Sequence, residues 1–278
     1  MKGARPTGPA PLVIIGGAED KAGDCRVLRE FVRLAGGARG KLAVMTVASE
    51  HASEVGAEYV RVFQRLGVKS VEPVEITSRA EAAADGVSGI LSKATGVFFT
   101  GGNQMRITNL LGGTAIDQLL HRRQEEHKLV LGGTSAGAAM MSSTMIVAGA
   151  SETTPRAGVV EVGPGMDFLR GAMIDQHFTR RGRAGRLLAA LAQYPHQLGI
   201  GIDEDTAMVV QGTTFRVIGS GAVTVFDLGQ ATLNNVLELK GDAHLALCGA
   251  RLHILPDGFG FDLHNRVPLP AGETPRSP

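Results

Sequence analysis

Residues 128–141, Lys128-Leu-Val-Leu-Gly-Gly-Thr-Ser-Ala-Gly-Ala-Ala-Met-Met141, join a short apolar run to a helix-forming sequence. The G-x-S-x-G segment between them is typical of a nucleophile elbow, where small neighbours permit a sharp turn and the serine is strained. We expect this turn to expose the Ser135 hydroxyl. The Ala136 N–H, at the helix start, would then stabilise an oxyanion with help from the helix dipole. Small-residue runs also occur where a helix merely packs closely on a strand, so the motif alone is a hypothesis.

Apolar β-rich runs alternate with helical patterns over the first two-thirds of the chain. Strands are expected at 11–15, 41–47, 71–76, 96–100 and 129–132, and helices at 24–34, 53–66, 79–88 and 115–126. This order predicts a three-layer α/β/α sandwich with a mostly parallel sheet. In the C-terminal third, Gly/Thr/Val-rich segments predict antiparallel strands, which extend the sheet or form a small β appendage: 207–211, 214–217, 223–227 and 251–255.

The composition gives no sign of disorder and does not favour a nucleic-acid or membrane protein. The 278 residues are 44% hydrophobic and 20% charged with a net charge of +1, which gives no long-range attraction to polyanions or membranes. We expect one α/β domain at 10–270 and loosely ordered tails at 1–9 and 271–278. The first ten residues lack an apolar signal region, which favours a cytoplasmic location. Cys25 and Cys248 are too few for a disulfide framework and are expected to be packing residues.

Glycine pairs follow two of the expected strands. Ile15 runs into Gly16-Gly17, and Thr100 runs into Gly101-Gly102. Glycine allows main-chain N–H groups to approach a ligand closely, so the second turn, through Gly102, is expected to supply another oxyanion donor. The Gly16-Gly17 pair is equally consistent with a plain tight turn. Neither pair is a dinucleotide fingerprint, because the G-x-G-x-x-G spacing is absent.

A serine nucleophile needs a base and an acid that orients it. His177 ends an apolar run ahead of an expected helix and is the preferred base, with His51 as a competitor. Three acids follow the apolar run 198–202, and each is also compatible with a simple turn: Asp203, Glu204 and Asp205. The chain order serine, histidine, acid differs from the serine, acid, histidine order of α/β-hydrolases, so the elbow does not imply that class.

Four arginines lie in the seven-residue segment 180–186, soon after His177: Arg180, Arg181, Arg183 and Arg186. Arg183 and Arg186 are three apart and are expected to share one helical face. Guanidinium groups bind carboxylates in a bidentate manner, so the cluster suits an anionic substrate. A solvated basic face or a phosphate site is the alternative. Nucleic acid is disfavoured, because no aromatic stacking residues lie nearby and the net charge is close to zero.

Six segments, in this order over about residues 12 to 230, resemble the cyanophycinase family: Gly16-Gly-Ala-Glu-Asp20, Phe99-Thr-Gly-Gly-Asn-Gln104, Gly133-Thr-Ser-Ala-Gly137, Asp175-Gln-His-Phe178, Arg181-Gly-Arg-Ala-Gly-Arg-Leu187 and Gly201-Ile-Asp-Glu-Asp-Thr-Ala207. That family is a branch of serine peptidases with a flavodoxin-like, class I glutamine amidotransferase-like sheet. Its members hydrolyse cyanophycin, a poly-aspartate carrying arginine on its β-carboxyls, to β-Asp-Arg dipeptides.

The resemblance implies roles for individual residues. Ser135 would be the nucleophile, His177 the general base and Glu204 the orienting acid, with Gly102 and Ala136 forming the oxyanion hole. It also implies a set of residues that line the substrate pocket: Gln104, Asp175, Gln176, Arg181, Arg183 and Arg186. In that arrangement the arginines hold aspartyl carboxylates and Asp175 meets a substrate guanidinium. The resemblance also implies that no metal or organic cofactor is required, that the partner is cyanophycin or a β-linked Asp-Arg peptide, and that a homodimer is expected.

Three other functions are compatible with parts of the pattern. An aspartyl dipeptidase-like serine peptidase would use the same elbow on the same core. A non-catalytic domain that binds anions or peptides would keep the fold without the chemistry. A glutamine amidotransferase-like activity is disfavoured, because those sites place cysteine at the elbow and neither Cys25 nor Cys248 lies there. The residues after about 234 match no motif.

Overall fold

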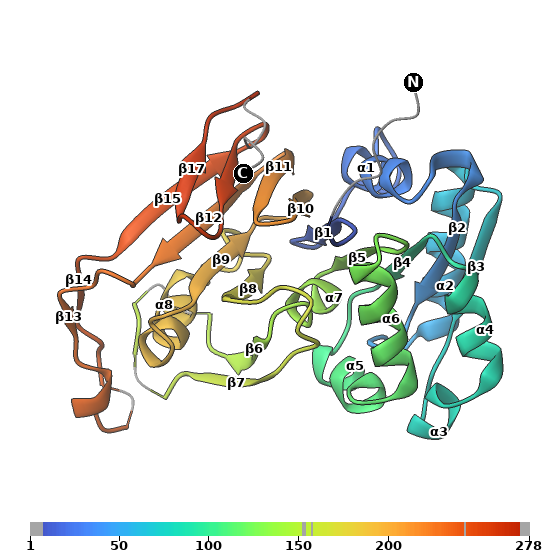
Figure 1. Cartoon of the computed structure of the whole chain (residues 1–278). Helices are drawn as coiled ribbons and strands as arrows, with labels where there is room; N and C mark the ends of the chain where they lie inside the picture. The colour runs from blue at the N-terminus through green and yellow to red at the C-terminus, as the bar shows by residue number, and fades with distance from the viewer. Residues whose placement is uncertain (1–7, 152–153, 157, 242, 273–278) are drawn as a thin grey trace.

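The computed structural model describes residues 8–151, 154–156, 158–241 and 243–272. Its large sheet has nine strands in the order β17-β16-β11-β10-β1-β5-β4-β2-β3 (Figure 1). The parallel half comprises β1 (Leu12–Ile15), β5 (Val130–Thr134), β4 (Gly96–Phe99), β2 (Lys41–Met45) and β3 (Ser70–Val74). The antiparallel half comprises β10 (Thr206–Gln211), β11 (Thr214–Gly219), β16 (Gly260–Asp262) and β17 (Val267–Leu269). The predicted α/β fold with an antiparallel extension is confirmed.

A second sheet of four strands lies beside the first, in the order β15-β12-β9-β8. Its strands are β8 (Ala172–Gln176), β9 (Leu198–Ile202), β12 (Ala222–Asp227) and β15 (Arg251–Pro256). Strands β8 and β9 are parallel, whereas β12 and β15 add to them antiparallel. The segments at 207–211, 214–217, 223–227 and 251–255 were expected to extend the sheet or to form a small β appendage, and both occur. Strands β10 and β11 extend the large sheet, whereas β12 and β15 belong to the small one.

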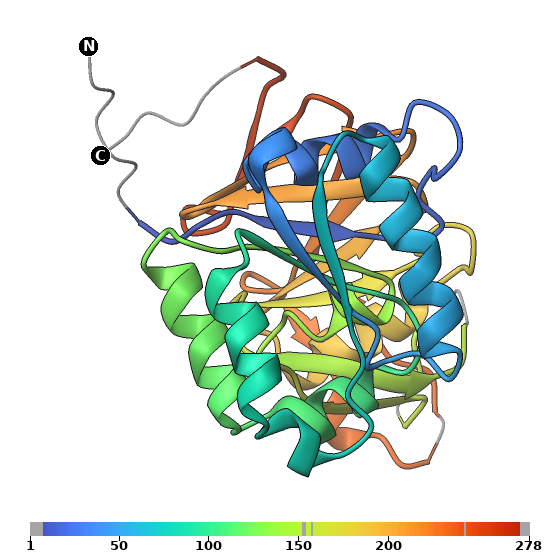
Figure 2. The ribbon, with the colours of Figure 1, turned by 90° about the vertical axis from the view of Figure 1, so that its right-hand side faces the viewer.

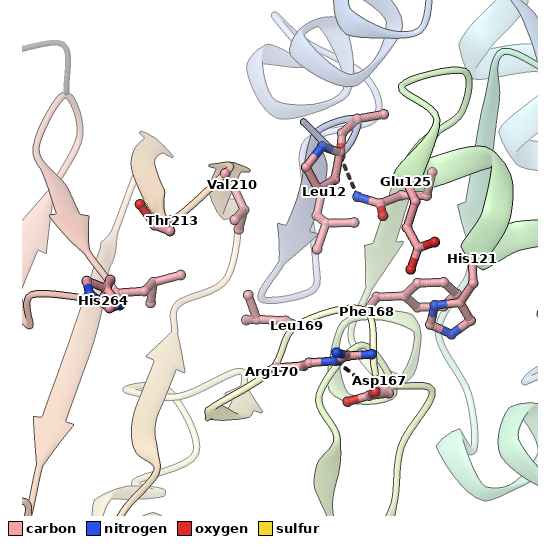
Figure 3. Close-up of a pocket in the computed structure, with 15 residues that line it drawn as sticks. Leu12, His121, Glu125, Asp167, Phe168, Leu169, Arg170, Val210, Thr213 and His264 are labelled. Carbon is pink, nitrogen blue, oxygen red and sulfur yellow. Dashed lines mark hydrogen bonds and ion pairs between the residues drawn. The ribbon is translucent and has the colours of Figure 1, made fainter. Parts of the chain in front are cut away.

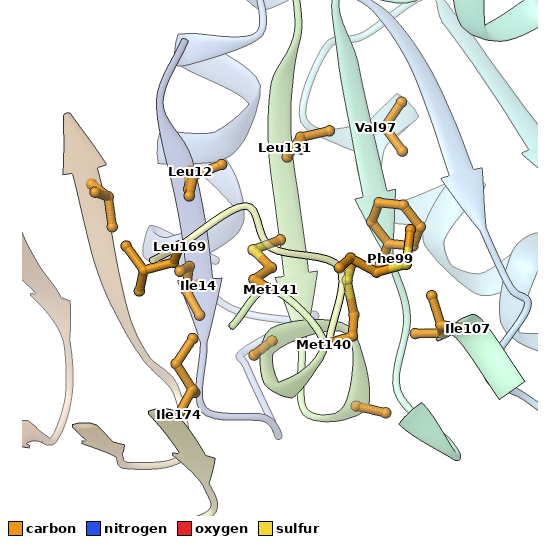
Figure 4. Packing of buried hydrophobic residues seen from close by; sticks show 14 of the residues in the cluster. Leu12, Ile14, Val97, Phe99, Ile107, Leu131, Met140, Met141, Leu169 and Ile174 are labelled. Atoms are coloured by element: carbon orange, nitrogen blue, oxygen red, sulfur yellow. The ribbon is translucent and has the colours of Figure 1, made fainter. Parts of the chain in front are cut away.

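Helices cover both faces of the large sheet (Figures 1 and 2). On one face, α1 (Arg26–Leu34) and α2 (Ala52–Arg65) pack against Val13 and Ile15. The other face carries Leu12 and Ile14 (Figure 4). It is covered by the small sheet and by α4 (Asp85–Lys93), α5 (Gln104–Leu111), α6 (Ala115–Glu125) and α7 (Ala136–Ala139). Alternate side chains of β1 thus enter two different cores, as the two-residue period of a strand requires. Helix α8 (Ala184–Gln193) packs on the small sheet.

Several elements differ from the sequence-based expectation. The helix expected at 79–88 is two helices, α3 (Arg79–Ala82) and α4, because bonds from the Ala83 and Ala84 N–H groups to residues three earlier close α3. Helix α5 was not expected, although its N-cap Asn103 accepts from the Met105 N–H at 2.9 Å. The remaining unpredicted elements are short: β6 (Thr144–Gly149), β7 (Val160–Pro164), β13 (Leu233–Asn234), β14 (Leu247–Cys248), β16, β17, η1 (Gly37–Arg39) and η2 (Val236–Glu238).

The two cysteines have different environments. Cys25 is buried as expected, whereas Cys248 is exposed on β14, so the prediction that it is a packing residue is wrong. Of the expected loose tails, 1–9 and 271–278, residues 1–7 and 273–278 lie outside the described residues. Among the described helices, none has both the length and the apolar character needed to cross a membrane.

An aromatic cluster joins α1 and α2 to the large sheet. The Phe98 ring lies 5.3 Å from the Phe31 ring and 5.3 Å from the Phe63 ring, and all three side chains are fully buried. We expect Phe98→Ala to lower the free energy of unfolding by about 3–5 kcal/mol, through lost burial and the cavity left behind. Urea denaturation measures this. Leu237→Ala removes a side chain that is 96% exposed, and should change the free energy of unfolding by less than about 0.5 kcal/mol.

Candidate active site

Ser135 lies at a strained turn between β5 and α7. Its φ of 53° and ψ of −110° are unusual for a residue with a side chain, and its N–H bonds to the Ile15 carbonyl at 3.1 Å. The flanking glycines are sterically required, because a Cβ on Gly133 would lie 2.2 Å from the Gly137 carbonyl oxygen, and one on Gly137 would lie 2.3 Å from that of Phe99. The turn therefore has the conformation expected for a nucleophile elbow.

Three side chains form a chain of hydrogen bonds at the carboxyl ends of β5, β8 and β9. The Ser135 Oγ is 3.0 Å from His177 Nε2, and His177 Nδ1 is 2.7 Å from Glu204 Oε1. The other two acids serve the backbone, since Asp203 accepts from the Thr179 and Ala222 N–H groups and Asp205 accepts from Asp20. The competing histidine, His51, is the N-cap of α2.

The Gly16-Gly17 turn holds this chain of bonds together. The Gly16 carbonyl accepts from the His177 N–H at 2.8 Å, and the Gly17 carbonyl accepts from the Asp205 N–H at 2.9 Å. A Cβ on Gly17 would lie 2.3 Å from Cε1 of the His177 ring, so the imidazole rests directly on the backbone. The Gly16-Gly17 pair therefore forms a tight turn, and this turn also positions the His177 base.

Strained backbone is concentrated at this edge. Eight described residues other than glycine have positive φ, and four of them belong here: Ala18, Ser135, His177 and Asp205. Left-handed conformations of residues with a Cβ cost free energy and tend to occur where function requires a side chain to be aimed. The strain and the hydrogen bonds therefore point to the same edge of the sheet.

The environment of His177 favours its neutral form. Burial lowers the pKa of His177 below the ordinary 6.5, and the positive charges of Arg181 and Arg183 lower it further, whereas Glu204 opposes the shift. Glu204 also lies 3.3 Å from Arg180, an exposed side chain. A neutral imidazole whose Nδ1 proton is held by a carboxylate presents its Nε2 lone pair to the serine, which is the state a general base needs.

Backbone N–H groups suitable for an oxyanion flank Ser135. Ala136 is the first residue of α7, where N–H groups have no acceptor one turn earlier. The expected dipole contribution is small, because α7 has only four residues. Gly101 is the nearer glycine of the second turn, since its Cβ would lie 3.4 Å from Ser135 Cβ. Gly102, with φ of 139°, is pressed against the Ala48 carbonyl.

Two members of the arginine cluster, Arg183 and Arg186, are buried. Asp175 is 1% exposed, accepts from Arg186 Nε at 2.7 Å and lies 3.3 Å from Arg183. Arg183 also donates to the side chain and carbonyl of Gln176, and burial lowers its pKa to about 10. Asp175 thus pairs with Arg183 and Arg186, as a buried charge requires a partner. The expectation that Asp175 meets a substrate guanidinium, and that Arg183 and Arg186 hold substrate carboxylates, stays a prediction.

The two remaining predicted pocket residues are more open. Arg181 is exposed. Gln104 is half-buried at the start of α5 and donates to the Ile146 and Val147 carbonyls at 2.9 and 3.1 Å. Sequence reasoning missed Glu19, which is 5% exposed and accepts from the hydroxyls of Thr134 and Tyr59 beneath the elbow. The signal available in the sequence was an acid two residues after the Gly16-Gly17 pair.

Two pockets lie at opposite edges of the large sheet. One of about 450 Å³ includes Leu12, His121 and His264 and lies near the amino ends of the parallel strands (Figure 3). The other, of about 360 Å³, includes Ser135 and Gly101. Ligands of open α/β sheets bind at the carboxyl ends of the strands, so we assign the chemistry to the pocket at Ser135 although the other is larger.

Serine-type hydrolases have this arrangement: a serine on an elbow is hydrogen-bonded to a histidine, and the histidine is hydrogen-bonded to a carboxylate. The model of peptidase family S51 matches residues 12–218, and the chain belongs to this family. Cyanophycinase of Nostoc sp. is 37% identical over 94% of this chain and 88% of its own length, and that of Geminocystis herdmanii is 37% identical over 93% and 95%. The crystal structure of a peptidase from an acI-B1 Actinobacterium has the same fold, with a TM-score of 0.66 and 17% identity over 92% of this chain and 97% of its own.

The close contact between Gly17 and the His177 ring predicts that a Cβ at position 17 impairs the reactivity of Ser135. Gly17→Ala should reduce the rate at which a fluorophosphonate probe labels Ser135 by about 100-fold, because the imidazole must move from the serine. Gly67→Ala is the matched control, since Gly67 has φ of 96°, close to the 102° of Gly17, but open space around its Cβ position. Equal labelling rates in the two variants would contradict the expected clash between a Cβ at position 17 and the His177 ring.

The lowered pKa of His177 predicts the acidic limb of reactivity. Protonated His177 cannot accept the serine proton, so the labelling rate should fall as the pH drops through this pKa, with its midpoint below 6.5. Glu204→Gln removes the charge that raises the pKa, so the midpoint should move lower still while the plateau rate also falls. A pH titration of labelling measures both, and a midpoint above 7 in the unmodified protein would contradict the assignment of His177.

Proposed function

We propose that this protein hydrolyses cyanophycin and releases β-Asp-Arg dipeptides. The observation that carries the proposal is the hydrogen-bonded chain Ser135, His177 and Glu204 in a member of peptidase family S51. Relatives named cyanophycinase support the substrate, because they align over nearly the whole chain at 37% identity. The geometry supplies a nucleophile, a base and an acid to orient it, which together suffice for acyl transfer without a metal or organic cofactor.

In the acylation step, Ser135 Oγ attacks the backbone carbonyl carbon of an aspartyl residue while His177 Nε2 accepts the hydroxyl proton. Glu204 holds the Nδ1 proton and stabilises the imidazolium that forms. The N–H groups of Ala136 and of the Gly101-Gly102 turn, including Gly102, bind the oxygen of the tetrahedral intermediate. One such donor is worth about 2.7–4 kcal/mol of transition-state stabilisation.

Collapse of the intermediate breaks the C–N bond, and His177 gives its proton to the leaving amine. Water then enters, loses a proton to His177 and attacks the acyl-enzyme carbonyl. The second tetrahedral intermediate expels Ser135 Oγ, which takes the proton back. The neutral resting state of His177 suits both steps, because each begins with the imidazole accepting a proton.

Substrate contacts outside the reacting centre are assigned to the more open residues. The guanidinium of Arg181 is exposed near His177, and we propose that it binds a substrate carboxylate. Gln104 is proposed to contact the substrate through its amide oxygen, since its Nε2 is engaged by Ile146 and Val147. Asp175, Gln176, Arg183 and Arg186 are proposed to hold the strand end that carries His177.

We further propose a cytoplasmic homodimer. Cys25 and Cys248 are unpaired, which suits a reducing compartment. Strand β15, at the edge of the small sheet, exposes Leu252 and Ile254, which are 53% and 64% accessible. Unpaired strand edges with apolar side chains are suited to association with a second copy.

The nucleophile assignment is tested with the polymer itself. Ser135→Ala should lower the release of β-Asp-Arg from cyanophycin by roughly 10⁴-fold or more, because no other group can form the acyl-enzyme. Mass spectrometry of the soluble products measures this, and polymer binding should be retained. Ser92→Ala changes an exposed serine on α4 and should leave turnover unchanged. If the unmodified protein cleaves aspartyl dipeptides in place of the polymer, the substrate assignment is wrong.

A further inference from the structure

The pocket beside Ser135 contains charged groups that the acyl-transfer steps do not use. Its volume is about 360 Å³, within the range of ligand sites, and its lining includes Ser135 and Gly101 from the catalytic edge. Lys21 enters it from the loop after β1, and Glu58 and Tyr59 enter it from α2. A ligand bonded to the serine would therefore have a cation, a carboxylate and an aromatic ring within reach.

Lys21 and Glu58 form an ion pair that a ligand can open. Lys21 Nζ is 3.0 Å from Glu58 Oε2, and the two side chains are 29% and 45% exposed. Exposed ion pairs contribute little to stability, so exchanging each partner for a ligand group of the same charge costs little. Lys21 Nζ also lies 4.5 Å from the centroid of the Tyr59 ring, whose face attracts cations.

The floor of the pocket is held in place from two elements. The Tyr59 hydroxyl, from α2, and the Thr134 hydroxyl, from β5, both donate to the Glu19 carboxylate. Burial, together with the charge of Glu19, raises the pKa of Tyr59 well above 10, so its hydroxyl remains a donor. The Tyr59 ring, which is 3% exposed, is thereby fixed beneath Lys21.

The loop that carries Lys21 is also ordered. The Asp20 carboxylate accepts from the N–H groups of Cys25, Gly23 and Ala22, and these bonds lower the pKa of Asp20 to about 2. The Asp20 N–H in turn donates to Asp205 beside the catalytic edge. Hydrogen bonds between backbone N–H groups and the carboxylates of Asp20 and Asp205 therefore fix this loop beside the site, and with it the position of Lys21 relative to Ser135.

We propose that this pocket is the subsite for one arginine-bearing side chain of the substrate. Lys21 binds the arginine α-carboxylate, Glu58 binds the guanidinium, and the aliphatic stem packs on Val55 and Tyr59. The identity of the ligand rests on the proposed function, because β-linked arginine keeps both its carboxylate and its guanidinium free. Lys21 then exchanges the Glu58 carboxylate for the ligand carboxylate, and Glu58 exchanges the Lys21 ammonium for the ligand guanidinium. Each side chain keeps a partner of opposite charge.

The pairing of opposite charges selects among ligand classes. An anion alone would satisfy Lys21 but repel Glu58, and a simple cation would do the reverse. An apolar side chain would leave both ions without compensation. A zwitterionic side chain satisfies both, and the guanidinium fork is suited to a carboxylate.

The test measures binding of the β-Asp-Arg dipeptide by calorimetry, alongside two neutralised analogues. Glu58→Gln should weaken β-Asp-Arg by about 10- to 100-fold, the range for a hydrogen bond to a charged group, and leave β-Asp-citrulline unchanged. Lys21→Met should weaken β-Asp-Arg by a similar factor and leave β-Asp-argininamide, which lacks the carboxylate, unchanged. Glu126→Gln and Lys128→Met are matched controls, because this pair is also exposed, with Glu126 45% accessible, and lines neither pocket.

Three results would overturn the subsite: no binding of β-Asp-Arg to the unmodified protein, unchanged affinity in both variants, or equal weakening of all three ligands. Hydrolysis of cyanophycin, assayed in parallel, separates this proposal from the function on which it rests. If the unmodified protein hydrolyses the polymer but binds the dipeptide without dependence on these charges, the subsite alone is rejected. Charge-specific binding without hydrolysis would reject the proposed activity and leave an arginine site.

Discussion

The carboxyl end of β1 is the point on which the site depends. Within three residues, its carbonyls accept the N–H groups of Ser135, His177 and Asp205. The backbone there approaches the His177 ring too closely to allow a Cβ. Residues from both sheets and from three loops are thus held in place by this one turn. A Cβ added at Gly17 would displace the His177 ring. This constraint explains why Gly17 must be glycine independently of its positive φ.

The division of the strands between two sheets explains the chain order of the site. Ser135 follows β5 of the large sheet, whereas His177 and Glu204 follow β8 and β9, adjacent parallel strands of the small one. Parallel neighbours end at the same edge, so the base and the acid meet side by side. The order serine, histidine, acid is therefore a consequence of adding a second sheet after the elbow.

Buried charge near the site is compensated in two different ways. Asp175 is neutralised by the guanidinium groups of Arg183 and Arg186, whereas Glu19 accepts from the hydroxyls of Thr134 and Tyr59. A desolvated carboxylate needs one or the other, since an unpaired buried charge is costly. Arg183 and Arg186 are engaged by Asp175 for this reason, and charge remains available to a ligand where side chains are more open, at Arg181, Lys21 and Glu58.

The sequence by itself determined the βα alternation, the elbow at Ser135 and the strand-end positions of His177 and the three acids, because period, glycine placement and apolar runs are local properties. It could not choose among Asp203, Glu204 and Asp205, since adjacent side chains point in different directions and only the packed loop decides which one reaches His177. It also could not reveal that Asp175 binds its own arginines, or that Lys21 and Glu58 share a pocket with Ser135. Those facts depend on contacts between segments far apart in the chain, which exist only once the two sheets have packed together.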